Sequence, residues 1–134
     1  MENPSSGKSA LGLDANVAAG LCYVANFVCY LGIVMSIIVL VTDKANKLAR
    51  FHAVQSLMLI AANLVIVLPG YFIAIALGMM NSSITSIMAL LVWLVVLAIG
   101  LAIFVFFIIS AIKAFQGQIY KVPVIGNMAD NWSN

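Results

Sequence analysis

The sequence predicts an all-α integral membrane protein, a bundle of three transmembrane helices with the N-terminus outside the cytoplasm and the C-terminus inside. Of the 134 residues, 65% are hydrophobic and 7% are charged, and the mean hydropathy is +1.18. Soluble domains carry about 25% charged residues. Two stretches, 15–42 and 53–112, contain no Asp, Glu, Lys or Arg, and uncharged apolar runs of about 18 or more residues are typical of membrane spans.

The first transmembrane helix is expected at 15–42, after an extracytoplasmic segment at 1–14. Its apolar run, 17–41, would be about 37 Å long as a helix, which crosses a hydrocarbon core of about 30 Å once with some tilt. The apolar region of a signal peptide is shorter, about 7–15 residues. We therefore expect this run to stay in the protein as a membrane span.

The second helix is expected at 52–80, after a basic cytoplasmic loop at 43–51. Pro69 and Gly70 interrupt this run and indicate either a kink or a re-entrant hairpin. The ten residues after Gly70 would reach only about 15 Å as a helix, so a single kinked helix is favoured. A polar turn at Asn81-Ser82-Ser83 then leads into the third helix, expected at 84–112.

The distribution of basic residues supports three passes. Only Lys8 precedes the first span, and the turn after the second span is uncharged. The other five basic residues fall on one side in a three-helix arrangement, which the positive-inside rule makes cytoplasmic. They are Lys44, Lys47, Arg50, Lys113 and Lys121.

Two sets of side chains are expected to hold the helices together or to face a partner. The first is a helix-packing seam of small residues along the first span, made of Ala18, Cys22, Ala25, Cys29, Gly32 and Ser36. The second is a set of polar residues that form interhelical contacts or line a path for a solute, made of Asn26, Ser56 and Asn63. The spans contain no charged residue that could carry protons.

The cytoplasmic tail, 113–134, combines basic, apolar and turn-forming residues and is expected to lie at the membrane interface. The residues that define this interfacial tail are Lys113, Gly117, Lys121, Pro123 and Gly126. The simple interpretation is an anchor, and the alternative is a docking segment for a partner.

No enzymatic chemistry is expected. Cys22 and Cys29 are about 10 Å apart along one helix, too far for a disulfide, and a single histidine argues against a protein-only zinc or haem site. The sequence therefore predicts no catalytic residue, no metal site and no cofactor. A net charge of +2 without a basic block also argues against a nucleic-acid partner.

Three stretches of the chain resemble a known family: the lead into the first span, the loop with the start of the second helix, and the tail. They read Leu13-Asp14-Ala15-Asn16-Val17-Ala18-Ala19, Arg50-Phe51-His52-Ala53-Val54-Gln55-Ser56 and Lys121-Val122-Pro123-Val124-Ile125-Gly126. The family consists of small prokaryotic membrane proteins of unknown function, described as similar to the twenty-kilodalton membrane subunit of the chloroplast inner-envelope import translocon. The resemblance implies a role for the cytoplasmic-rim motif of Arg50, His52 and Gln55.

Together these observations predict a non-enzymatic, multi-pass protein of the plasma (inner) membrane of a prokaryote. Its partners would be the lipid bilayer and either further copies of itself or other membrane subunits, in a membrane complex to which it contributes as an interaction or accessory subunit. The alternative is a homo-oligomeric channel or translocation component, with a polar path lined by Asn26, Ser56 and Asn63.

Overall fold

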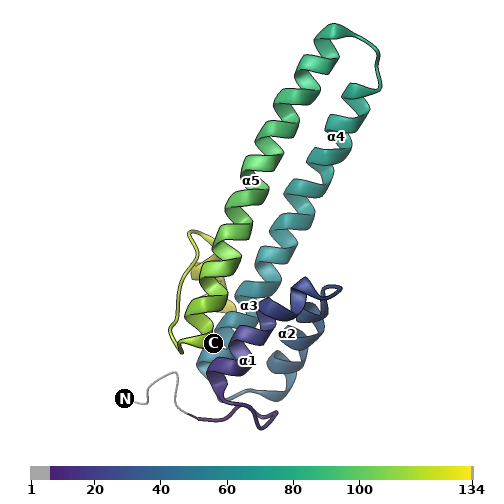
Figure 1. The fold of residues 1–134 in the computed structure, drawn as a ribbon. Helices are drawn as coiled ribbons and strands as arrows, with labels where there is room; N and C mark the ends of the chain where they lie inside the picture. The colour runs from purple at the N-terminus through teal and green to yellow at the C-terminus, as the bar shows by residue number, and fades with distance from the viewer. Residues whose placement is uncertain (1–6, 134) are drawn as a thin grey trace. The chain divides into compact units, whose positions relative to one another are not determined.

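The structure, a computed structural model, describes residues 7–133 and is built from helices, with no strand among those residues. The start of the expected N-terminal segment, 1–6, and residue 134 of the tail lie outside the described residues. Figure 1 shows the order of the elements. They are α1 (Ala15–Val24), the 3₁₀ turn η1 (Ala25–Phe27), α2 (Leu31–Thr42), α3 (Lys47–Ala62), the π-helical turn η2 (Asn63–Val67), α4 (Leu68–Gly78), α5 (Ser83–Phe115) and α6 (Ile125–Ser133).

The chain divides into two compact units, which we describe separately. Unit 1 comprises Met1–Leu59 together with Phe106–Asn134, and unit 2 comprises Ile60–Val105. Two helices are long and apolar enough to cross a membrane, Lys47–Gly78 with 32 residues and Ser83–Phe115 with 33 residues. Each of these helices contributes residues to both units.

The segment 15–42 is not the single helix that the sequence predicts. It forms two shorter helices, α1 and α2, which pack side by side and run in opposite directions (Figure 1). Between them Cys29 and Tyr30 adopt positive φ angles of 51° and 58°, which reverse the chain. The ten residues of α1 and the twelve of α2 would extend about 15 and 18 Å. Each helix is therefore about half as long as a hydrocarbon core is thick.

Hydrogen bonds from side chains explain why the helix can break after α1, inside the apolar run 17–41. The last turn of a helix leaves carbonyl oxygens without partners, and these are costly when buried. The Cys22 carbonyl near the end of α1 accepts hydrogen bonds from Asn26 Nδ2 at 2.9 Å and from Ser56 Oγ at 2.7 Å. Gly32 has no side chain, so the Asn26 amide packs directly over it.

The core of unit 1 consists mainly of small side chains. Ala18 and Cys22 of α1 pack against Val39 of α2 and against Ala49 and Ala53 of α3. Small residues allow helix backbones to approach closely, which is how helices associate in membranes. Most of the predicted seam is used here, inside the chain: Ala18, Cys22, Gly32 and Ser36 are buried, Ala25 is half-buried, and only Cys29 is exposed.

The second apolar run is one helix from Lys47 to Gly78, and the chain does not form a hairpin at Pro69. Its irregularity lies one turn earlier, in the π-helical turn η2. Proline has no N–H group, and its ring collides with the carbonyl four residues before it. Widening the preceding turn is a known way for a helix to accommodate this conflict.

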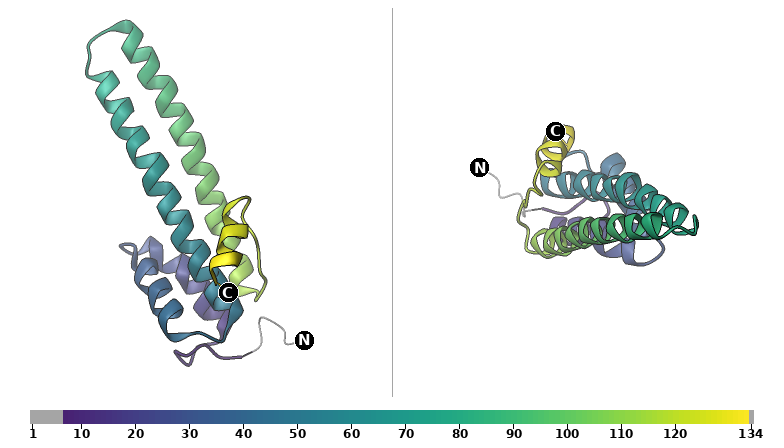
Figure 2. Two further views of the ribbon diagram at one scale, coloured as in Figure 1. Left: turned by 180° about the vertical axis from the view of Figure 1, so that it is seen from behind. Right: turned by 90° about the horizontal axis from the view of Figure 1, so that it is seen from above.

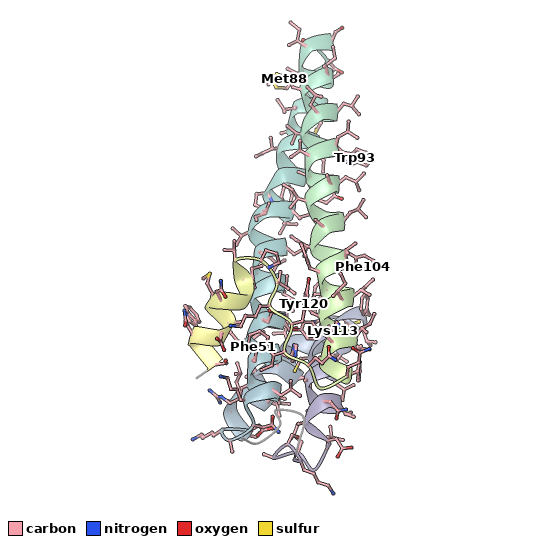
Figure 3. All side chains as sticks on the ribbon, turned by 90° about the vertical axis from the view of Figure 1, so that its left-hand side faces the viewer. Phe51, Met88, Trp93, Phe104, Lys113 and Tyr120 are labelled. Carbon is pink, nitrogen blue, oxygen red and sulfur yellow. The ribbon has the colours of Figure 1, made fainter. Side chains whose placement is uncertain are left out.

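Within unit 2, η2 and α4 lie against the middle of α5. A Cβ atom at Gly70 would collide with Val96, so the two helices approach closely there. Val67, Ala74 and Val96 are buried, while most other apolar side chains in unit 2 are exposed. Figure 3 shows Met88 and Trp93 projecting outward from α5.

The tail folds back along unit 1. Helix α5 ends at Phe115, and Gly117 turns the chain with a φ of +72°, a conformation that favours glycine. The chain then runs past Tyr120 to α6 (Figure 3). Ala129 of α6 packs on Phe51 and Val54 of α3, and Figure 2 shows α6, in yellow, beside α3.

Candidate functional site

A buried polar network lies at the centre of unit 1. His52 and Gln55 point from one side of α3, and neither exposes any surface. The Tyr23 hydroxyl of α1 lies 2.9 Å from Nδ1 of His52 and 3.1 Å from Nε2 of Gln55. Three side chains from two helices therefore share one hydrogen-bonded cluster.

The same cluster holds the tail. His52 Nε2 lies 2.9 Å from the Gln118 carbonyl oxygen. Gln55 Nε2 donates to the Tyr120 carbonyl at 3.0 Å, and Gln55 Oε1 accepts from the Val122 amide at 3.2 Å. The Gln55 amide thus donates to one backbone group of the tail and accepts from another. Together with the contact between His52 and Gln118, these bonds fix residues 118–122 against α3.

The third residue of the rim motif, Arg50, fixes two other segments. Its Nε donates to the Ser133 carbonyl of α6 at 3.0 Å, and its Nη1 donates to the Leu40 carbonyl of α2 at 3.0 Å. The sequence predicts that Arg50, His52 and Gln55 act together at the cytoplasmic rim. The structure places all three on the first turns of α3, where they bond α1, α2 and the tail.

The tail carries one clear ion pair. Lys121 Nζ lies 2.9 Å from Asp130 Oδ2, and Lys47 Nζ lies 3.9 Å from Asp130 Oδ1. The hydrogen bond from Lys121, with smaller contributions from the charges of both lysines, holds the pKa of the Asp130 carboxyl below its usual value. Asp130 therefore stays ionised and helps to hold α6 in place.

The other predicted tail residues, Lys113, Gly126 and Pro123, do not form a common cluster. Lys113 Nζ donates to Gln118 Oε1 at 3.1 Å. A Cβ atom at Gly126 would lie 2.5 Å from the Lys121 Cα, so the backbone packs too closely there for a side chain. Pro123 is exposed.

The structure brings together two of the three predicted polar contacts. Asn26 Nδ2 donates to Ser56 Oγ at 3.2 Å. Asn63 belongs to unit 2, is half-buried, and makes no side-chain hydrogen bond to any residue between 7 and 133.

Sequence reasoning missed the residues that complete the network, above all Tyr23 and Ser110. Both are fully buried, and the Ser110 hydroxyl lies 3.3 Å from Gln55 Nε2. A tyrosine in an apolar run is a weak signal of such a partner, because its hydroxyl needs a hydrogen bond when it is buried. Nothing in the spacing of Tyr23 and Gln55 indicates that they meet.

Within residues 7–133, no group of three or more His, Cys, Asp or Glu side chains is arranged to hold a metal ion. The buried cluster is instead made of one imidazole, one phenol, one amide and backbone groups. Such a cluster holds segments together, and its groups are bonded to one another rather than directed into an open cavity.

Comparison with known proteins gives the family. The chain matches the magnetosome magnetite crystal formation protein family over residues 14–129. A UPF0132 membrane protein of Methanocaldococcus jannaschii is 31% identical over 127 residues, 95% of this chain and 96% of the relative. A second UPF0132 membrane protein of that organism is 30% identical over 124 residues, 92% of this chain and 73% of the relative.

A UPF0132 membrane protein of Archaeoglobus fulgidus is 29% identical over 118 residues, 88% of this chain and 94% of the relative. No solved structure matches the chain. These relatives support the predicted family of small prokaryotic membrane proteins, but they do not link it to the chloroplast import translocon. The chain is therefore a helical membrane protein that belongs to the magnetosome magnetite crystal formation protein family and is similar to the UPF0132 membrane proteins of archaea.

Proposed function

We propose that this protein is a non-enzymatic subunit of an assembly in a prokaryotic plasma membrane, formed with further copies of itself or with other membrane proteins. The observation that carries this proposal is the unpaired side chain of Asn63 among the described residues. Its side chain lies near the middle of the 32-residue apolar helix Lys47–Gly78 and has no hydrogen-bond partner among residues 7–133.

An amide in this position has a strong preference for a partner. Water is absent from the hydrocarbon core, so an unbonded polar group there costs several kcal/mol. Asparagine side chains in membrane helices commonly bond across helix interfaces, and each such contact contributes about 1 kcal/mol. In the proposed assembly, a helix of a second protein supplies the partner that Asn63 does not find among residues 7–133.

A groove in unit 2 supports the same proposal. Between α4 and α5 lies an open groove of about 400 Å³, lined by Tyr71, Ala74, Ile75, Ala89, Leu90 and Trp93. Two alanines leave space between two large aromatic side chains. Space of this kind accepts side chains of another helix.

The test is Asn63→Leu, which keeps the branching of the side chain at Cγ and removes its ability to form hydrogen bonds. We expect self-association in the membrane, or co-purification of a partner, to weaken about fivefold, because a contact of about 1 kcal/mol is lost. Asn63→Gln keeps an amide at this position and should retain most of the self-association or co-purification. Asn127→Leu makes the same change at an exposed site on α6 and serves as the control. Unchanged assembly in Asn63→Leu overturns the proposal.

The second candidate is the conducting oligomer, and the position of Asn63 favours it too. Asn63 begins the π-helical turn η2, and such turns frequently occur at functional sites. Asn26 and Ser56 bond to each other in unit 1, so a path would depend on Asn63 side chains from several copies. This candidate predicts that Asn63→Leu abolishes solute flux in proteoliposomes while the oligomer stays intact.

We also infer the topology that accompanies this function. Two helices cross the membrane, while α1 and α2 enter it and return to the same side. All six basic residues then lie on one side, because each belongs to unit 1. The positive-inside rule makes that side cytoplasmic. This replaces the expected outside position of the N-terminus with a cytoplasmic one, and the C-terminus remains cytoplasmic.

A further inference from the structure

We propose that unit 1 contains a binding site for a phosphate group, at a pocket where α2, α3 and α6 meet. The pocket has a volume of about 430 Å³ and is lined by Leu40, Lys44, Lys47, Arg50 and Ser133. Three of these five residues are basic. The site is independent of the assembly proposed above, since it lies in unit 1 and uses none of the residues invoked there.

Among residues 7–133, two of the three basic side chains in this pocket form no ion pair. Arg50 bonds to two carbonyl oxygens, which are neutral acceptors. Within residues 7–133, no carboxylate lies within ion-pair distance of Arg50 or Lys44. A guanidinium that is fixed by neutral groups presents its remaining donors and its full charge to a ligand.

Of the pocket cations, only Lys47 forms an ion pair with a carboxylate of residues 7–133, and that contact is long. Asp130 lies 3.9 Å from Lys47 but 2.9 Å from Lys121. The shorter contact to Lys121, outside the pocket, is the stronger one. Lys47 is exposed, so its ammonium group remains able to turn toward an anion in the pocket.

The start of α3 is already capped by polar groups of this chain. Asp43 Oδ1 accepts a hydrogen bond from the Asn46 amide at 3.3 Å, and Asn46 Oδ1 accepts one from the Ala49 amide at 3.2 Å. These caps satisfy N–H groups of the first turn, so the attraction for an anion in the pocket comes from Lys44, Lys47 and Arg50.

The place of the pocket in the chain indicates the ligand. Lys47 begins the 32-residue apolar helix, so it lies where a spanning helix leaves the hydrocarbon core and meets the headgroups. Basic pockets at this level bind lipid headgroups. The shared chemistry is a phosphate oxygen anion, which reaches the site either as the phosphodiester of an anionic phospholipid or as a soluble phosphate compound.

The experiment uses native mass spectrometry of the full chain in a neutral detergent. The probes are phosphatidylglycerol, zwitterionic phosphatidylcholine and inorganic phosphate. The test variant is the double substitution Lys44→Gln with Lys47→Gln, which leaves the structural bonds of Arg50 in place. The control is Lys8→Gln with Lys113→Gln, which removes the same charge outside the pocket. Circular dichroism of each variant verifies that it is folded.

We expect the protein to retain phosphatidylglycerol in preference to phosphatidylcholine. Retention should fall about tenfold or more in the pocket variant, because each lysine near a headgroup contributes a several-fold preference, and should persist in the control. Binding of inorganic phosphate that depends on Lys44 and Lys47 and displaces the lipid supports the site with a soluble ligand. Equal retention by both double variants, or no preference between the two lipids, overturns the proposal.

Discussion

The hydroxyl of Tyr23 lies 2.9 Å from Nδ1 of His52, and the bonds around this pair fix the direction of each hydrogen. The Gln118 carbonyl can only accept, so His52 Nε2 carries a hydrogen and donates to it at 2.9 Å. In the neutral imidazole Nδ1 then accepts, and the Tyr23 hydroxyl donates to it. The Tyr23 oxygen in turn accepts from Gln55 at 3.1 Å.

Removal of the Tyr23 hydroxyl should therefore destabilise unit 1. Tyr23→Phe leaves His52 Nδ1 without a donor and Gln55 with one acceptor fewer, both in a buried site. We expect a loss of about 1–2 kcal/mol of unfolding free energy, measured by titration with SDS in bicelles. Tyr30→Phe makes the same change at an exposed tyrosine and should have no measurable effect. Equal stability of the two variants would contradict the network.

Part of this cluster is singled out by the sequence. Arg50, His52 and Gln55 are expected to form a cytoplasmic-rim motif, and the structure places all three in contacts with the other segments of unit 1. These three residues are identified through the resemblance of the segment 50–56 to a known family. Their partners could not be, because most are backbone carbonyls, which every residue has.

The hairpin in 15–42 could not be predicted, for a different reason. Its turn contains neither glycine nor proline, and the reversal occurs at Cys29 and Tyr30, residues that rarely adopt positive φ. The contacts that stabilise the break come from Ser56, distant in sequence, and from Asn26 packed over Gly32. An uncharged run of 28 residues is typical of a single span. Here the tertiary contacts stabilise two short helices in place of one long helix.

The packing of α6 depends on the absence of a side chain at Gly126. In Gly126→Ala the new methyl group would lie 2.5 Å from the Lys121 Cα, and backbone atoms must move to accommodate it. We expect α6 to loosen, seen as faster tryptic cleavage after Lys121. Gly78→Ala is the matched control: a Cβ atom there meets no other atom within 4 Å, and alanine favours a helix over glycine. Unchanged cleavage in Gly126→Ala would show that α6 is not held at this point.

The contact between Asp130 and Lys121 makes the position of α6 dependent on pH. The folded-state pKa of Asp130 is lowered, so its contribution to stability is present above the unfolded-state pKa of about 4 and is lost as the pH falls through the folded-state value. We expect the fluorine NMR signal of 5-fluorotryptophan at Trp132 to shift as the pH falls below about 4. Trp93, on the part of α5 in unit 2, provides a reference signal.

Asp130→Asn separates this effect from the titration of other carboxylates. The variant has no charge at this position at any pH, so its Trp132 signal should resemble that of the acidified protein and should change little with pH. A pH-dependent shift of the same size in Asp130→Asn would assign the titration to another group.

If α1 and α2 form a hairpin in the membrane, the residues that flank the segment 15–42 must be accessible from the same side. The chain reverses between the two helices, so the topology proposed above puts residues 11 and 44 on the same side of the membrane and residue 82, which follows the helix Lys47–Gly78, on the other. We replace Leu11, Lys44 or Ser82 with Cys, in a chain that carries Cys22→Ala and Cys29→Ser. A membrane-impermeant maleimide should label positions 11 and 44 only from the cytoplasmic side, and position 82 only from outside. Labelling of position 11 from outside would show that the segment 15–42 crosses the membrane once, as its composition alone predicts.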